Sequence, residues 1–201
     1  AAYRNGPVSS NVRPHMPTVV AFSGMPASGK TTLAARVASL IGFPHLDKDT
    51  ILESLFISEG VSSQEQRSRL SRKADQLLLS QCRELSDVVI SSWWHHPSSS
   101  SQSGTEVDWL KDLGMTLIEV HCTCSPEVAL HRYTSRQRHP GHFDNLRNPQ
   151  ELLTQFMEAS TLGPLFPNLA LTYNTELVLD ENAVLQLATA IEHRISVTNA
   201  A

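Results

Sequence analysis

The sequence predicts an α/β fold of three layers, in which helices cover both faces of a mostly parallel, five-stranded sheet. Short apolar runs alternate with longer segments of helical periodicity, and the runs are apolar on both faces, as buried parallel strands are. A length of 201 residues and a hydrophobic share of 40% suit one domain of this class. We expect a flexible tail over residues 1–16 and the domain over 17–197.

The individual elements follow from apolar spacing and from start and stop residues. Strands are predicted over 18–22, 43–46, 87–91, 115–122 and 169–173. Helices are predicted over 31–41, 50–58, 62–85, 105–113, 126–138, 151–160 and 181–195. Gly42 is a typical helix stop, and Ser125 before Pro126 is typical of a helix start. We expect a flexible serine-rich loop over 98–104 and an irregular loop over 139–149.

Charge and cysteine content exclude several classes of protein. The 16 Lys and Arg residues are outnumbered by 20 Asp and Glu residues, so no bulk positive charge favours nucleic acid or a membrane surface. No apolar run approaches the ~20 residues of a membrane span. The three cysteines (Cys82, Cys122 and Cys124) form no disulfide framework and favour a cytoplasmic location. We expect Cys122 to be a buried core thiol, because the His and Cys spacings do not suit structural zinc.

The segment Gly24-Met-Pro-Ala-Ser-Gly-Lys-Thr31 matches the phosphate-loop pattern G-x-x-x-x-G-K-[ST] between a predicted strand and a predicted helix. Glycines let successive N–H groups point into one concavity, and the helix start adds unpaired donors and partial positive charge. Lys30 should reach the β- and γ-phosphates of a nucleotide, and the Thr31 hydroxyl should ligate Mg²⁺. The predicted nucleotide-binding residues are Gly24, Met25, Pro26, Ala27, Ser28, Gly29, Lys30, Thr31 and Thr32.

Two carboxylates directly after the second strand, Asp47 and Asp49, favour a kinase over other phosphate-loop proteins. The chain lacks the N-K-x-D pattern of GTPases, and its third strand ends in Ser91-Ser92 rather than in the acid typical of motor ATPases. We predict that Asp47 lies on the metal side and that Asp49 accepts a proton from an attacking hydroxyl. Asp49 also stands where an N-cap for the following helix is expected.

An arginine series late in the chain predicts a lid over about residues 132–149. Arg132 and Arg136 are spaced to share a helix face, and Arg138 follows them. Arginines that close over a transferring phosphoryl group stabilise its spreading negative charge and exclude water. Pro140 and Gly141 suit a segment that moves.

The phosphate loop, Asp47-Lys48-Asp49 and the stretch from Arg132 to His142 together resemble the small P-loop kinases grouped as predicted ATP-dependent kinases. That group is similar to chloramphenicol phosphotransferase, the kinase half of polynucleotide kinase and the zeta-toxin kinases, and more distantly to gluconate and shikimate kinases. The resemblance covers about residues 17–195. It implies a three-layer P-loop kinase fold, ATP and Mg²⁺ as the nucleotide and metal, and Lys30 and Thr31 as their ligands.

The resemblance also implies that Asp49 is the general base and that Arg132, Arg136 and Arg138 act from the lid. Asn174 stands where the family often has the Asp of an Asp-Thr pair near adenine, so the chain departs from the pattern there. The expected function is transfer of the ATP γ-phosphate to a hydroxyl of a small molecule. A 5′-hydroxyl polynucleotide kinase, a zeta-toxin-like nucleotide-sugar kinase and a non-catalytic ATP-binding interaction module remain alternatives.

The acceptor side of the site is predicted from residues that follow the third strand. Trp93, Trp94 and His95 should lie at the carboxyl edge of the sheet, where paired tryptophans form the wall of an acceptor pocket. One of the two tryptophans is expected to pack beneath the end of the sheet instead. The sequence does not identify the acceptor or the oligomeric state.

Overall fold

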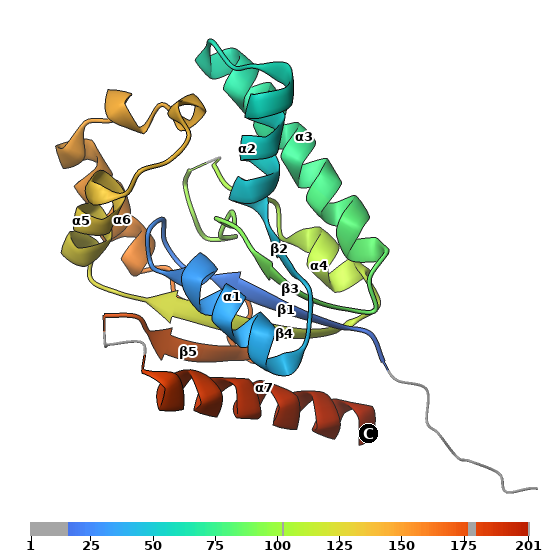
Figure 1. The fold of residues 1–201 in the computed structure, drawn as a ribbon. Coiled ribbons are helices and arrows are strands. Elements are labelled where there is room, and N and C mark those ends of the chain that lie inside the picture. Colours follow the sequence, from blue (N-terminus) through green and yellow to red (C-terminus); the bar gives the residue numbers. More distant parts are fainter. Residues whose placement is uncertain (1–15, 102, 177–179, 201) are drawn as a thin grey trace, which may run out of the picture.

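The computed structural model describes residues 16–101, 103–176 and 180–200, and its centre is a five-stranded parallel sheet (Figure 1). The strands are β1 (Thr18–Ser23), β2 (His45–Asp47), β3 (Asp87–Ser91), β4 (Thr116–Thr123) and β5 (Ala170–Asn174). Their order across the sheet is β2-β3-β1-β4-β5, and every neighbouring pair runs parallel. The predicted fold class is therefore confirmed.

Seven α-helices connect and cover the strands in the described part of the chain. They are α1 (Lys30–Ile41), α2 (Lys48–Glu59), α3 (Gln64–Arg83), α4 (Asp108–Asp112), α5 (Pro126–Ser135), α6 (Pro149–Ser160) and α7 (Glu181–Ala200). Two short 3₁₀ turns, Pro140–His142 and Asp144–Leu146, lie between α5 and α6.

The central strand β1 shows why the apolar runs carry no alternation. All six of its residues are buried, because Val20 and Phe22 face one helical layer while Val19 and Ala21 face the other. The first layer consists of α1 and α7, and the second includes α3 and α4 (Figure 1). A strand buried on both faces gains from apolar residues at every position.

The parallel connections bring the carboxyl ends of the strands to one edge of the sheet, and two helix pairs flank that edge (Figure 1). Helices α2 and α3 pack around Phe56 and Leu70 beyond β2 and β3. Helices α5 and α6 pack around Tyr133 and Phe156 beyond β4. The loop between β1 and α1 lies between the two pairs, as expected for a ligand site in such a sheet.

Several predicted boundaries shift. Helix α5 ends at Ser135 rather than 138, because Arg136 takes an extended conformation (φ −75°, ψ 146°). The expected loop over 139–149 contains the two 3₁₀ turns, and α6 begins at Pro149, because Asn148 caps it. The helix expected over 105–113 shortens to α4, and Thr105 instead bridges Trp94. The strand expected over 43–46 is β2, at 45–47.

Parts of two sequence predictions fall outside the described residues. The expected tail over 1–16 does so except for Met16, and the serine-rich loop over 98–104 does so at residue 102. Within the described residues, no helix is both long and apolar enough to cross a bilayer. Cys122 is 1% exposed, and burial raises the pKa of its thiol to about 12, which confirms it as a core thiol.

Candidate functional site

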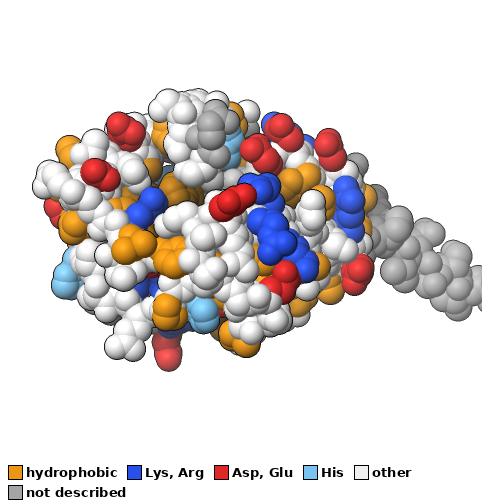
Figure 2. All heavy atoms as spheres, turned by 90° about the horizontal axis from the view of Figure 1, so that it is seen from above, with side chains coloured by type: hydrophobic (Ala, Val, Ile, Leu, Met, Phe, Trp, Pro, Cys, Tyr) orange, Lys and Arg blue, Asp and Glu red, His pale blue; other side chains and the backbone are white. Residues whose placement is uncertain are grey.

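A cavity of about 560 Å³ opens at the carboxyl edge of the sheet. Its lining comes from the β1–α1 loop, the starts of α2 and α3, the helices α5 and α6, and the segment between those two helices. Figure 2 shows the face seen from above Figure 1, on which blue Lys and Arg side chains lie beside red Asp and Glu and among apolar and uncharged ones. The cavity therefore joins most of the residues that the sequence singled out.

The phosphate loop has the backbone of an anion-binding concavity. Gly29 precedes α1 in the left-handed conformation (φ 84°), and Ala27 is also left-handed (φ 60°). Gly24 (φ 129°) lies directly against β4, where an added Cβ would be 2.3 Å from the carbonyl oxygen of Cys122. The loop therefore runs close against the sheet, and it leads into the start of α1, whose first N–H groups have no partner within the helix.

Lys30 is held where a phosphate would meet it. Its side chain lies in the cavity wall, and Nζ donates to the carbonyl oxygen of Met25 across 3.2 Å. Burial lowers the pKa of the Lys30 ammonium, although Asp49 and Asp47 act in the opposite direction. An anion seated in the loop would raise this pKa again and stabilise the charged form of Lys30, so the site favours a negative ligand.

Asp47 connects the phosphate loop to two strands and a helix. One carboxylate oxygen accepts from the Thr31 hydroxyl at 3.1 Å and from the Ser91 hydroxyl at 2.6 Å. The other accepts from the backbone N–H of Thr50 at 3.0 Å and so caps α2. The helix N-cap is thus Asp47, and the expectation that Asp49 occupies that position is wrong: Asp49 lies in the first turn.

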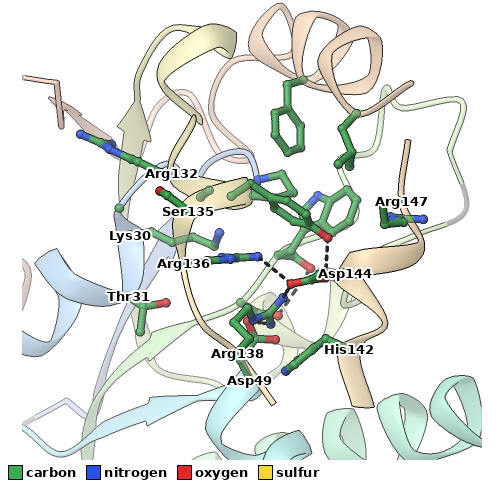
Figure 3. A pocket seen from close by; sticks show the side chains of 18 of the residues that line it. Lys30, Thr31, Asp49, Arg132, Ser135, Arg136, Arg138, His142, Asp144 and Arg147 are labelled. Atoms are coloured by element: carbon green, nitrogen blue, oxygen red, sulfur yellow. Dashed lines mark hydrogen bonds and ion pairs between the residues drawn. The ribbon is translucent and has the colours of Figure 1, made fainter. Parts of the chain in front are cut away.

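Asp49 and Asp144 share Arg138 at the mouth of the cavity (Figure 3). Nη2 of Arg138 is 2.5 Å from Asp49, and Nη1 is 3.2 Å from Asp144. Asp144 also accepts from the Tyr133 hydroxyl at 2.5 Å and lies 3.8 Å from Arg136. These hydrogen bonds and cations hold the pKa of Asp144 below its ordinary value against the effect of burial.

The three predicted lid arginines do not lie together as one group. Arg132 points away from the others and donates to Thr175, at 3.1 Å to the hydroxyl and 2.7 Å to the carbonyl oxygen. Arg136 lies beyond the end of α5 with its guanidinium 4.5 Å above the Tyr133 ring. The prediction that Arg132 and Arg136 share a helix face is therefore wrong.

The residues after β3 divide between cavity and core. Trp93 lines the cavity, whereas Trp94 is buried and donates from Nε1 to the carbonyl oxygen of Phe22 at 2.9 Å. His95 lies near Glu106, at 3.6 Å, and does not line the cavity. The structure thus places one tryptophan at the site and the other beneath the end of the sheet, as expected, and leaves His95 outside.

Several lining residues were given no individual role by the sequence. Thr175 donates to the carbonyl oxygen of Ser28 at 2.5 Å and ties the end of β5 to the phosphate loop. His142 is buried against Phe56, and its Nε2 is 2.9 Å from Glu53 of α2. Arg67 and Arg147 complete the mouth of the cavity. His142 and Arg147 fall within the predicted lid and Thr175 directly follows a strand, whereas Arg67 had no such signal in the sequence.

Metal-binding groups are few in this arrangement. In the described ranges, no three or more His, Cys, Asp and Glu side chains are grouped so that they could hold an ion by themselves. Thr31 and Asp47 do bring two oxygen atoms within 3.1 Å beside the phosphate loop. Hydroxyl and carboxylate oxygens suit Mg²⁺, which usually binds through one or two protein ligands together with substrate phosphates.

Comparisons with known proteins agree with this geometry. A family model described as an AAA domain (AAA_33) matches residues 19–159. A candidate kinase from Chloroflexus aurantiacus J-10-fl is similar at 24% identity and a TM-score of 0.71, over 87% of this chain and 98% of that one. No curated protein matches the sequence.

Two further solved structures share the fold. Shikimate kinase from Bacteroides thetaiotaomicron matches at 20% identity and a TM-score of 0.57, over 90% of this chain and 99% of that one. A gluconokinase from Sinorhizobium meliloti 1021 matches at 17% identity and a TM-score of 0.50, over 90% and 99% of the two chains. At these identities the likeness shows a common small P-loop kinase fold.

Proposed function

The chain belongs to the AAA_33 family of AAA domains, within the small P-loop kinases, and on that premise we propose an ATP-dependent phosphotransferase acting on a hydroxyl of a small molecule. One observation carries the proposal: a single cavity holds both the phosphate loop and the carboxylate of Asp49. The loop would bind the donor, and the rest of the cavity would hold the acceptor. Kinases among the structural neighbours support the same class of reaction.

The donor end of the cavity consists of the loop backbone, Lys30 and Thr31. Loop N–H groups and the start of α1 would bind the phosphates, with Lys30 between the β- and γ-phosphates. Thr31 and Asp47 fit Mg²⁺ by their oxygen ligands and would hold it there. When bound, the ion supplies charge neutralisation for the phosphates.

At the acceptor end, Asp49 would orient the acceptor hydroxyl and take its proton. The hydroxyl oxygen forms a bond to the γ-phosphorus as the bond to the bridging oxygen breaks, and ADP leaves. Arg138 donates to Oδ2 of Asp49 at 2.5 Å, and the acceptor hydroxyl would bind this half-exposed carboxylate beside Arg138 or in its place. Arg136 and Arg138 would then stabilise the negative charge on the transferring group.

The proposal is tested by separating ATP binding from acceptor-dependent release of ADP. Asp49→Asn should lower ADP release by about a hundredfold or more, because a general base contributes that much, and should leave ATP affinity near that of the wild type. Lys30→Ala should weaken both. Calorimetry with Mg-ATP measures binding, and a screen of hydroxyl compounds measures transfer.

Asp112→Asn is the matched control, because Asp112 is exposed at the end of α4, away from the cavity. Full turnover by Asp49→Asn would remove the general-base assignment. Failure of the wild-type protein to bind ATP with Mg²⁺ would remove the proposed function altogether. Binding without transfer to any hydroxyl compound would favour the non-catalytic ATP-binding module.

A further inference from the structure

The mouth of the cavity carries positively charged side chains in addition to Lys30 of the phosphate loop. Four arginines line this part of the cavity, whereas two aspartates, Asp49 and Asp144, lie among them. Two of the arginines are Arg136 and Arg138, whose guanidinium groups already contact those aspartates. The other two, Arg67 on α3 and Arg147 just before α6, form no ion pair with a carboxylate among the described residues.

Arg67 is the more unusual of the two. It is half-buried, and its Nε is fully enclosed with no hydrogen-bond partner in the described part of the chain. A buried donor without a partner is costly. Burial lowers the pKa of Arg67, and the neighbouring cations Arg138 and Arg147 lower it further, against opposing contributions from Asp144 and Asp49. These conditions favour a ligand that brings negative charge.

Arg147 approaches the same place from the other side of the cavity. It precedes α6, and its guanidinium forms a hydrogen bond with the Tyr133 hydroxyl. It also lies close enough to Arg67 to lower the pKa of that side chain. Two arginine forks from different elements can hold the oxygens of one anionic group, which is a recurrent use of this side chain. Gln64, one helical turn before Arg67, lines the cavity beside it.

This pair is separate from the donor end. Lys30 bonds to Met25 within the phosphate loop, whereas Arg67 stands in the first turn of α3 and Arg147 just before α6. Figure 3 shows the same division, with Lys30 and Arg132 on one side of Asp144 and Arg147 on the other. Asp49, in the first turn of α2, lines the same cavity as the phosphate loop and the arginine pair.

We propose that the acceptor carries an oxyanion, either a carboxylate or a phosphate, and that Arg67 and Arg147 bind this group while the hydroxyl of the acceptor faces Asp49. The inference rests on the proposed function and specifies its substrate class: a hydroxylated acid or a phosphorylated alcohol rather than a neutral alcohol. The anionic group anchors the acceptor on the side of Asp49 that is remote from the phosphate loop. The cavity lining thus assigns Arg67 as a specificity-determining residue.

The test uses three compounds that differ only in one end group: glycerol, glycerate and glycerol 3-phosphate. The protein of residues 1–201 is saturated with Mg-ADP, so that the phosphate loop is filled, and is titrated with each compound at constant ionic strength. Binding is read by calorimetry and by the shift in melting temperature. Wild type, Arg67→Gln and Arg69→Gln are compared, because Arg69 is exposed on the same helix and does not line the cavity.

Saturable binding of at least one anion, with none of glycerol, is the expected result, together with at least tenfold weaker binding to Arg67→Gln. Arg69→Gln should match the wild type. Binding of glycerate alone identifies a carboxylate site, binding of glycerol 3-phosphate alone a phosphate site, and binding of both a general oxyanion site. The inference fails if neither anion binds saturably, or if Arg67→Gln binds them as tightly as the wild type does.

The two proposals fail in different ways. Loss of the anion site with intact Mg-ADP binding overturns only the substrate class, whereas absence of nucleotide binding by the wild type overturns the proposed function. A second readout is ADP release with hydroxyl compounds supplied in neutral and anionic forms. Equal turnover of the neutral and anionic forms would also overturn the inference.

Discussion

Two segments line the same cavity but are held in different ways. One is the phosphate loop, and the other spans residues 136–148, the part of the predicted lid that lies between α5 and α6 and that is called the lid below. The loop is fixed through its backbone: Gly24 lies against the carbonyl of Cys122, and Thr175 bonds to the carbonyl of Ser28. The lid is fixed through side chains, by Arg138 to Asp49, by Asp144 to Tyr133 and by His142 to Glu53. Each of these lid contacts joins two polar or charged side chains.

This difference indicates which part moves. A loop packed against buried strands opens only when the sheet itself is disturbed, so the donor site is preformed. Hydrogen bonds and ion pairs between side chains can be exchanged for contacts with a ligand without disturbing the sheet. The contacts of the lid therefore suit a segment that opens and closes, and one of them, from Arg138, engages Asp49, the proposed general base.

The largest effect is expected from breaking the backbone support of the phosphate loop with Gly24→Ala. The new Cβ would lie 2.3 Å from the Cys122 carbonyl oxygen, at a φ of 129° that side chains rarely adopt. Strain and overpacking should cost about 2–4 kcal/mol of unfolding free energy. ATP affinity should fall as the loop shifts. Denaturant unfolding and Mg-ATP calorimetry measure the two effects.

Gly42→Ala provides the matched control. Gly42 is also left-handed, at φ 72°, but nothing lies within 4 Å of the position of its Cβ. This variant should lose about 1 kcal/mol of stability from the helix end alone and should retain ATP binding. Equal loss of ATP affinity in both variants would contradict the claim that close packing against β4 positions the loop.

A smaller and more local effect is expected in the lid from Asp144→Asn. The substitution removes the charge shared by Arg138 and Arg136 and weakens the acceptor of the Tyr133 hydroxyl. Stability should fall by about 1–2 kcal/mol. Hydrogen exchange should rise over the lid and stay unchanged in the phosphate loop, as measured by mass spectrometry. Asp112→Asn serves again as the exposed control, and uniform acceleration across the chain would contradict a lid held independently.

The same contrast explains how much the sequence could predict. The strand, loop and helix around Lys30 follow from a local sequence pattern. An apolar strand, two loop glycines and the start of the helix follow one another directly along the chain. The partners of the lid are not local: Arg138 meets Asp49 across 89 positions of the chain. Sequence spacing predicted arginines in the lid but could not pair them.

Errors at the site have similar causes. The expected shared face of Arg132 and Arg136 assumed that α5 continues through Arg136, whereas the helix ends one residue earlier. The caps at Asp47 and Asn148 each lie three residues before the helix starts predicted at 50 and 151. Arg67 was not singled out, because a cationic residue on an amphipathic helix is ordinarily solvated, and only the tertiary structure shows that its Nε is enclosed.

The smallest effect concerns His142, which fastens the lid to α2. Burial lowers the pKa of its imidazole below the ordinary value of 6.5, and nearby Arg138 lowers it further, against opposing contributions from Asp49 and Glu53. The unfolded chain therefore takes up a proton first as the pH falls through about 6.5, and stability should decrease below that pH.

The pKa values of His45 and His121 are lowered as well, so replacing His142 alone removes only part of the dependence of stability on pH. Denaturant midpoints at pH 7.5 and 5.5 should differ less for His142→Gln than for the wild type or for the exposed control His193→Gln. An unchanged difference in His142→Gln would show that this histidine does not link the lid to pH.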